Sequence, residues 1–526
     1  MLRRFSFVLA SALVACSPAA PRPSGSAEWT ASGDSPTFSP RAAYETAPTS
    51  GGTRGLPSAA RLRDEIRARL PGRTLDEDGR LAELAERVLY QTRDSGRGPS
   101  AVELDALVRK MGLVVAMPMV GVFPVNGGTF SGLDDYLAGV PKNLSFSHLG
   151  VTVVDLGGQL AGAAALAGEH VALEPVPRRI EPGQTVALRG TVAADYHDVE
   201  LAWTEPGGKT ERRKLGTGSR VAETSAPLAA GIHRVELLAV GPSGLEVIAN
   251  FPVAVGVSPD VDRPAPLAVD ETDPKAALLS LTNETRREAG VSLLAPDPIL
   301  DRVAEAHSAD MAEHGFFGHQ SPTTGMVDDR ARAAGLRLGL LGENVAKAPS
   351  IAEAHALLLA SPGHRDNIVN PRFSHVGLGV VLEHASAPTV WAVTEVFAGI
   401  PRPLSDPARA ADAAFAAVAK ARSAASVPAL ARSSSLDDLA RRMATRVVQE
   451  PKTDLGTIAT ESAKPWVAKT RVGIPLILIT FFADPEDLAT DVRAEDPKLR
   501  HAGVAVAQSA DADALRTSVE VLLATE

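Results

Sequence analysis

The sequence is poor in three features, and each shortage narrows what the protein can do. One cysteine in 526 residues means that no internal disulfide can stabilise a domain. Aromatic residues make up 4% of the chain, which argues against an aromatic carbohydrate-binding platform but leaves protein contacts open. A net charge of -10 provides no basic field to displace counterions from phosphates, so nucleic acid is not expected as a partner.

The N-terminal apolar run, Phe5–Val14, is too short to cross a bilayer as a mature helix. It follows Arg3–Arg4 and leads into small residues that end at Cys16. A positive start, a short apolar stretch and small residues are the pattern of an export signal. We therefore expect residues 1–16 to be a signal peptide.

The segment Leu13–Cys16 resembles the lipobox of bacterial lipoproteins. The resemblance implies cleavage before Cys16 and lipidation of its thiol and of the new amino terminus. More than one acyl chain would give stable anchoring, so the membrane is an expected partner. Ser17 after the cysteine favours the outer membrane if the cell is Gram-negative. The alternative is an ordinary signal peptide with a coincidental cysteine.

The length of 526 residues indicates three or four domains. Residues 17–55 are dense in Pro, Ser, Gly and Thr, which predicts a flexible linker. Residues 174–257 show short alternating runs broken by glycine and proline turns, which predicts a small immunoglobulin-like β-sandwich acting as a spacer or interaction module. Residues 258–274 form a proline-containing linker that ends at Asp273–Pro274, an N-cap followed by a first-turn proline.

An internal echo relates three regions of the chain. The matching positions are Arg67, Arg286 and Arg422; Leu81, Leu300 and Leu436; and, further on, His148, His375 and His501, each followed two residues later by a glycine, Gly150, Gly377 and Gly503. Such self-similarity predicts one fold used three times, with 56–173 and 401–526 as degenerate copies of 275–400. Chance alignment of Ala- and Leu-rich helices is the alternative.

Histidine is concentrated in the middle copy, where residues 301–397 hold seven of the twelve histidines. Histidine is the side chain best suited to bind a transition metal or move a proton near neutral pH. The histidines lie among four motifs in fixed order: Gly318–Pro322, Gly342–Asn344, Ser361–Ile368 and Ser374–Gly377.

These motifs, with Val376–Gly379 and Val393–Phe397, closely resemble the bacterial branch of the CAP superfamily, also called SCP-like extracellular domains. This is the cysteine-rich secretory, antigen 5 and pathogenesis-related 1 family. The resemblance implies an α-β-α sandwich with a mostly antiparallel sheet and an open cleft lined by histidines and acids. The expected fold class is therefore α+β: a CAP domain at 275–400, flanked by degenerate CAP-like domains and the small β-sandwich.

By that resemblance His319 and His375 match the two cavity histidines and Glu343 the cavity glutamate. Ser361 stands where animal members have a second glutamate, and His364, which follows it, either faces the cleft or serves a turn. The flanking copies lack the Gly-Glu-Asn and Ser-Pro-Gly-His motifs, so their lone histidines are expected to be structural.

One helix of the middle copy carries His307, Met311 and His314 on a shared face. We interpret His307 and Met311 as packing residues and His314 as solvated near the helix end.

Two imidazoles and a carboxylate make a plausible site for Zn²⁺ or another divalent cation, held by His319, His375 and Glu343. The alternative is a hydrogen-bonded polar cluster without metal. The sequence has no HExxH zinc-protease motif. Ser321 and Ser361 lack the strained Gly-x-Ser-x-Gly turn of a nucleophile.

Three functions remain open. The first is a lipid-anchored surface protein whose cleft binds a small ligand or divalent cation; its expected lining is His319, Glu343, His364 and His375. The second is a metal-assisted hydrolase of envelope polymers or peptides, with Glu343 as general base. The third is a structural or adhesion module that contacts envelope components.

Overall fold

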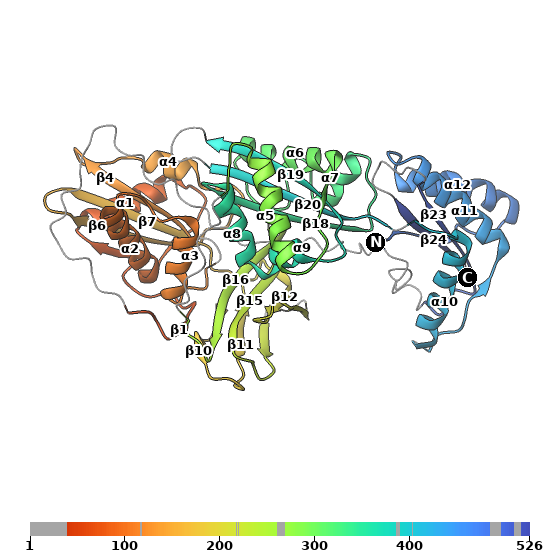
Figure 1. Cartoon of the computed structure of the whole chain (residues 1–526), viewed down its shortest axis with the longest axis horizontal. Coiled ribbons are helices and arrows are strands. Elements are labelled where there is room, and N and C mark those ends of the chain that lie inside the picture. Colours follow the sequence, from red (N-terminus) through yellow and green to blue (C-terminus); the bar gives the residue numbers. More distant parts are fainter. Residues whose placement is uncertain are drawn as a thin grey trace.

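The computed structural model describes residues 39–525 apart from 116–117, 217, 219, 243, 260–268, 385–389, 402, 425, 484–495 and 510–516. The expected signal peptide, Cys16 and most of the expected linker therefore lie outside the described residues. No helix in the described part of the chain combines the length and apolarity that a membrane crossing requires. Three α+β units follow one another along the molecule, and a β-sandwich packs beneath the first two (Figure 1).

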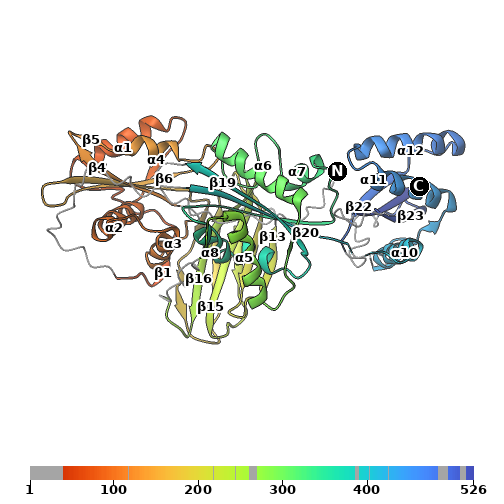
Figure 2. The same cartoon turned by 45° about the horizontal axis from the view of Figure 1, so that its top comes forward.

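The middle unit is an α-β-α sandwich. Its sheet has the order β17-β19-β20-β18, with β17 parallel to β19 and the other neighbours antiparallel. Helices α6 and α7 cover one face, and α5, α8 and α9 lie on the other (Figure 2). The expected α+β fold class is confirmed. The elements are α5 (Pro274–Glu288), β17 (Ala295–Pro296), α6 (Pro298–His314), α7 (Val327–Ala333), β18 (Leu340–Ala348), α8 (Ile351–Ala360), α9 (Pro362–Val369), β19 (His375–His384) and β20 (Val390–Gly399).

Local sequence signals begin two of these helices. Asp273 caps α5, and Pro274 is its first residue, as the sequence predicted. Asp297 caps α6 by accepting hydrogen bonds from the backbone N–H groups of Ile299 and Leu300. The cap fixes where α6 starts, and hence which of its side chains face the sheet.

The first and third units repeat the strand order of the middle unit, as β3-β6-β7-β4 and β21-β23-β24-β22. The first unit contains β2 (Thr53–Gly55), α1 (Ser58–Arg69), β3 (Asp76–Glu77), α2 (Gly79–Ser95), α3 (Ala101–Lys110), β4 (Met119–Asn126), β5 (Thr129–Phe130), α4 (Leu133–Ala138), β6 (His148–Asp155) and β7 (Leu160–Ala167). The third contains α10 (Pro407–Ala424), β21 (Ala431–Arg432), α11 (Ser434–Gln449), α12 (Leu455–Thr470), β22 (Leu476–Phe481), β23 (His501–Gln508) and β24 (Ser518–Thr525).

A glycine on one strand lets a helix approach its backbone closely in all three units. A Cβ built on Gly377 would lie 2.0 Å from the carbonyl carbon of Leu300. The equivalent distances are 2.2 Å from Gly150 to Leu81 and 2.3 Å from Gly503 to Leu436. Any larger residue would push helix and sheet apart, so the glycine and leucine positions of the echo mark this contact.

A buried arginine is the second shared feature. Arg286 and Arg422 are both fully buried and donate to backbone carbonyls, including those of Ser292 and Pro428 just after their own helices. Arg67 of the first unit donates to the carbonyl of Leu75 but is more exposed. The guanidinium ties the loop after the helix to the rest of the unit.

The β-sandwich has one five-stranded and one three-stranded sheet. Its apolar core includes Leu188, Leu201, Val235 and Phe251, which alternate with outward-facing residues along their strands. The larger sheet contains β10 (Arg179–Ile180), β16 (Gly244–Val255), β15 (Gly231–Gly241), β12 (His197–Thr204) and β13 (Thr210–Gly216); the smaller contains β14 (Arg220–Thr224), β11 (Ala187–Val192) and β8 (Val171–Leu173). The sandwich thus begins at β8, a few residues before the expected boundary at 174.

The expected linker 17–55 extends too far at its C-terminal end. Strand β1 (Ala43–Tyr44) pairs with β9 (Val176–Pro177), and β2 pairs with β6. Tyr44 is buried with its ring 4.8 Å from that of Phe251. Composition misses this because one aromatic anchor and a few backbone hydrogen bonds hold a segment that is otherwise rich in small and polar residues.

The first unit and the middle unit share one hydrophobic core, formed mainly by α2 and α3 on one side and α5 and α8 on the other. The backbone N–H of Ala101 also donates to Glu353 across this boundary at 2.8 Å. A continuous apolar core of this kind holds two units in a fixed relation.

Candidate functional site

Glu343 lies at the centre of a buried polar cluster on β18, beneath α6 and α7. Its Oε1 accepts a hydrogen bond from Nδ1 of His319 at 2.8 Å, and its Oε2 accepts one from Arg330 of α7. Burial by itself would raise the pKa of this carboxyl. The opposing positive charge of Arg330, with the nearby His307 and His319, prevails and lowers the pKa of Glu343 to about 2. The side chain is therefore a fixed anion.

His319 is held in one orientation by this anion. It follows Gly318, whose φ of 135° places the loop in a conformation that glycine adopts without strain. The backbone carbonyl of His319 accepts from Arg330 at 3.1 Å, so ring and backbone are both fixed. With Nδ1 donating to the carboxylate, the neutral form of the ring has its lone pair on Nε2.

His364 faces His319 from α9, with ring centroids 6.5 Å apart. It is fully buried, and neither ring nitrogen has a hydrogen-bond partner among the described residues. Burial, with a smaller contribution from His319, holds the pKa of His364 well below its usual range, so the ring is neutral. Buried polar atoms in native proteins are normally satisfied, so this ring calls for a ligand or a bound water.

His307 lies at the edge of the same cluster. Its Nε2 is 3.0 Å from the carbonyl oxygen of Gly318 and 4.0 Å from Oε1 of Glu343. Burial lowers the pKa of His307 to about 4. The sequence indicated a packing role, and the histidine does pack against Phe316, yet it also borders the carboxylate.

The expectation that His375 shares the cavity with His319 and Glu343 needs correction. His375 pairs with Ala398, which pairs with Leu341, two residues before Glu343 on a strand two places away. At ~4.8 Å between strands and ~3.3 Å per residue, the two Cα atoms are ~12 Å apart.

The ring of His375 is engaged elsewhere. Its Nδ1 lies 3.0 Å from Oγ of Ser374, and the negative charge of Asp297, at the start of α6, acts on it electrostatically. His148 of the first unit has an equivalent serine and aspartate, Ser147 and Asp78, and also lies 3.9 Å from Glu169. His375 therefore holds a position common to the repeat, and His364 stands opposite His319 in its place.

The expected metal ligands are not assembled. Within the described ranges, no three His, Cys, Asp or Glu side chains are grouped to hold a metal ion. Glu343 would have to release Arg330 to become a ligand, which leaves only His319 and His364. Zn²⁺ at ~2.0–2.1 Å from each nitrogen would draw the ring centres to ~5 Å.

The observed 6.5 Å separation of the two rings suits a different bridge. An oxygen atom hydrogen-bonded at ~2.9 Å to both rings, with a tetrahedral angle between its bonds, would hold the ring centres ~6.5 Å apart. The pair thus fits a hydrogen-bonding group as it stands and a Zn²⁺ ion after an approach of ~1.5 Å.

The cluster is poorly suited to hydrolysis. A carboxylate with a pKa of about 2 and both oxygens hydrogen-bonded is a weak general base. Ser321 donates to Asp310, and Ser361 donates to Glu236 of the β-sandwich. Neither hydroxyl is thus paired with a base as an activated nucleophile would be.

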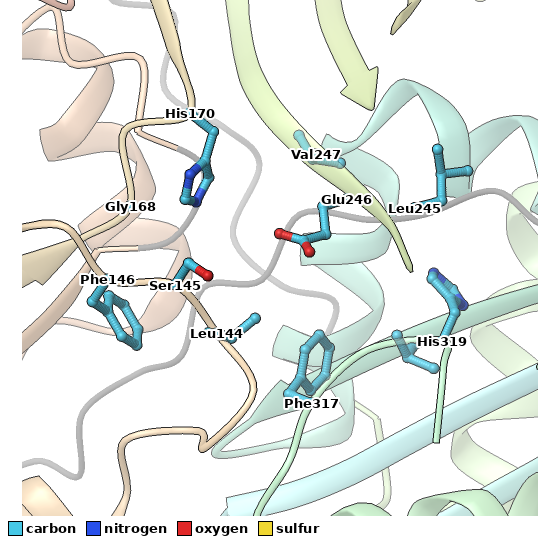
Figure 3. A pocket seen from close by; sticks show the side chains of 11 residues that line it. Leu144, Ser145, Phe146, Gly168, His170, Leu245, Glu246, Val247, Phe317 and His319 are labelled. Atoms are coloured by element: carbon cyan, nitrogen blue, oxygen red, sulfur yellow. The ribbon is translucent and has the colours of Figure 1, made fainter. Parts of the chain in front are cut away.

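A small pocket borders His319 where the first unit, the β-sandwich and the middle unit meet. Figure 3 shows Glu246 projecting from β16 between His170 on one side and His319 on the other. Tyr196 donates to Glu246 at 2.8 Å, and burial lowers the pKa of His170 to about 4. The volume of about 50 Å³ holds a few water molecules. The remaining lining residues are Leu144, Ser145, Phe146, Gly168, Leu245, Val247, Phe317 and Val345.

The motifs did not reveal every residue of the site. Arg330 lies between two motifs. Next to Asp328 and Asp329, it has the pattern of a residue on the charged, solvent-exposed face of a helix. Its burial beside Glu343 depends on how α7 packs on the sheet, which no spacing in the sequence records.

Comparison with known proteins assigns the middle unit. The family model described as "CAP: Cysteine-rich secretory protein family" matches residues 279–393. The uncharacterized protein YkwD of Bacillus subtilis (strain 168) is 38% identical over 118 residues, 22% of this chain and 45% of that protein. The uncharacterized membrane protein YlbC of the same organism is 33% identical over 114 residues, 21% of this chain and 32% of that protein. The chain thus spans less than half the length of these two relatives.

Solved structures give matches of low identity. An extracellular protein containing a SCP domain from Bacillus anthracis str. Ames is 19% identical with a TM-score of 0.22, covering 44% of this chain and 86% of that one. An outer surface protein from Borrelia burgdorferi is 18% identical with a TM-score of 0.22, covering 26% and 98%. The family model and the sequence motifs agree on the same segment, so residues 279–393 are a CAP domain, as the resemblance predicted.

Proposed function

We propose that this is an exported, lipid-anchored envelope protein whose CAP domain binds a small ligand or a divalent cation between His319 and His364. The observation that carries the proposal is the buried ring of His364, which has no hydrogen-bond partner among the described residues and faces His319 across 6.5 Å. An unsatisfied buried polar group costs about 1–3 kcal/mol, and a ligand that bonds to the ring recovers this free energy.

The charges around the two rings define the chemistry of the ligand. In its neutral form His319 has a lone pair on Nε2, and the neutral ring of His364 offers another. Glu343 lies immediately behind them as a buried anion paired with Arg330. The site therefore favours a hydroxyl or amine that donates hydrogen bonds, or a cation such as Zn²⁺, over an anionic group.

A calorimetric titration with ZnCl₂ tests the binding site, using the full-length protein in detergent. We expect His319→Ala and His364→Ala to remove the binding heat, because each deletes one of two nitrogens. His375→Ala is the matched control and retains it, since His375 lies ~12 Å from the cluster. Equal heats in all four proteins, or a loss confined to His375→Ala, would contradict the placement of the site.

The membrane anchor is tested separately. Cys16→Ser removes the only thiol in the chain, so we expect the protein to move from the membrane fraction to the soluble fraction of the cell envelope. Mass spectrometry of the mature N-terminus reports the acyl chains directly. An unmodified Cys16 in the mature protein would refute the anchor and leave the CAP site unaffected.

A further inference from the structure

The β-sandwich makes direct hydrogen bonds to α9, the helix that carries His364. Glu236, on β15, is fully buried at the boundary between the sandwich and the CAP domain. Its Oε2 accepts from Oγ of Ser361 at 2.7 Å, and its Oε1 accepts from the backbone N–H of Gly363 at 3.0 Å. Asn250, opposite it on β16, donates to Oε2 at 3.2 Å. A carboxylate from one domain thus binds the first turn of α9 in another.

This carboxylate is connected to His364 through one residue. Ser361 is the N-cap of α9, and its Oγ accepts from the backbone N–H of His364 at 3.4 Å. The same hydroxyl donates its proton to Glu236. The carboxylate therefore orients the serine, and the serine fixes the backbone from which the His364 ring projects.

Two further contacts hold the rest of α9 to the sandwich. Arg212 of β13 lies 3.5 Å from Asp366, and Arg365 donates to the carbonyl of Gly208 at 2.9 Å. Burial raises the pKa of Glu236 to about 7, and its contacts with the first turn of α9 and the charges of Arg212 and Arg109 oppose this shift. Because Arg109 belongs to α3, the first unit reaches the same junction. Two guanidinium nitrogens of Arg109, Nε and Nη1, have no hydrogen-bond partner in the described part of the chain.

The sandwich reaches His319 as well. Leu245, Glu246 and Val247 of β16 line the pocket that borders this histidine (Figure 3). A Cβ built on Gly244 would lie 3.1 Å from Oε1 of Gln320, the residue after His319. Both histidines of the pair are therefore flanked by the same neighbouring domain.

We infer that Glu236 is a positioning residue for His364, and that the ligand site of the CAP domain is complete only when the β-sandwich is seated on α9. The CAP segment itself offers Ser361 at this point and no carboxylate, and Glu236 provides one from another part of the chain. The inference rests on the proposed ligand site for its functional consequence, whereas the contact with α9 can be measured without any ligand.

The experiment compares Glu236→Ala with the conservative Glu236→Gln, which keeps one oxygen acceptor. Glu223→Gln is the matched control, because Glu223 belongs to the same sandwich and pairs with Arg213. Two ligand-free readouts are hydrogen exchange of the peptide spanning 361–369 and diethyl pyrocarbonate modification of His364. Exposed His197 serves as the internal reference for the modification.

We expect Glu236→Ala to speed exchange of this peptide and modification of His364 at least tenfold, with Glu236→Gln intermediate and Glu223→Gln unchanged. The Zn²⁺ affinity should fall in the same order. Unchanged exchange and modification in a folded Glu236→Ala protein would overturn the inference. Absence of Zn²⁺ binding in the unmodified protein would count against the proposed function alone. If Glu236→Ala fails to fold, Ser361→Ala breaks the same link from the CAP side, and the same two outcomes apply.

Discussion

The middle and third units share the same arrangement of strands and helices, but they differ at the position that Glu343 occupies in the middle unit. In the middle unit Gly377 pairs with Val396, which pairs with Glu343 on the next strand. In the third unit Gly503 pairs with Leu523, which pairs with Ile477, so Ile477 occupies the position equivalent to Glu343. In the first unit the same alignment leads to Val120. The shared arrangement therefore folds with an apolar residue at this position, so folding does not require the buried charge of Glu343.

We expect the largest effect on stability when Glu343 is replaced by the residue type that the third unit has at the equivalent position. Glu343→Ile leaves Arg330 buried without its carboxylate, so we expect a loss of about 3–5 kcal/mol in the free energy of unfolding. Adding Arg330→Met should recover most of the lost stability, because the double variant has two apolar residues at this position and no unpaired buried charge. Denaturant unfolding measures both proteins, and a double variant as unstable as the single one would show that the shared arrangement depends on the charge.

The same contrast predicts a contribution to pH dependence from Glu343 that the apolar residue at the same position of the third unit cannot make. The folded pKa of Glu343, about 2, lies below its ordinary value of 4.5, so its stabilisation is fully present above pH 4.5 and is lost as the pH falls toward 2. The lowering of this pKa from 4.5 to about 2 corresponds to ~3 kcal/mol. Glu343→Gln should flatten the fall in thermal stability between these values. An unaltered acid profile would contradict the assignment.

Glycine at the helix contact should matter equally in both units. Gly377→Ala and Gly503→Ala each bring a Cβ against the backbone of a leucine, at Leu300 and Leu436. We expect a loss of about 1–3 kcal/mol in each case. Calorimetry of the two single variants tests this. Indifference of one unit would show that its helix is free to move away from the sheet.

The smallest effects are expected at the histidines common to the repeat. His375→Ala and His148→Ala remove rings that each lie against a serine, and His148 also lies 3.9 Å from Glu169. Each substitution should cost less than about 1 kcal/mol. Thermal melts of the two variants should agree. A much larger effect at His375 alone would restore a special role for that residue.

Sequence reasoning succeeded where position along the chain determines contact. The spacing of the arginines, leucines and glycines indicated the repeated arrangement, and the motifs marked His319, Glu343 and His364, which the structure brings together. Contacts between distant elements were missed. His375 was misplaced because strand register decides its neighbours, and Arg330 and Glu236 were missed because helix and domain packing bring them in.

The pairing of β1 with β9 has a mechanical consequence. If Cys16 carries lipid, 22 residues separate it from Ser39, the first residue that the structure describes. Fully extended, they reach at most ~80 Å, which limits how far the body can stand from the bilayer. Tension on this segment would act first on β1, at the boundary between the first unit and the β-sandwich. It would reach His319 and His364 only through the domains that surround them.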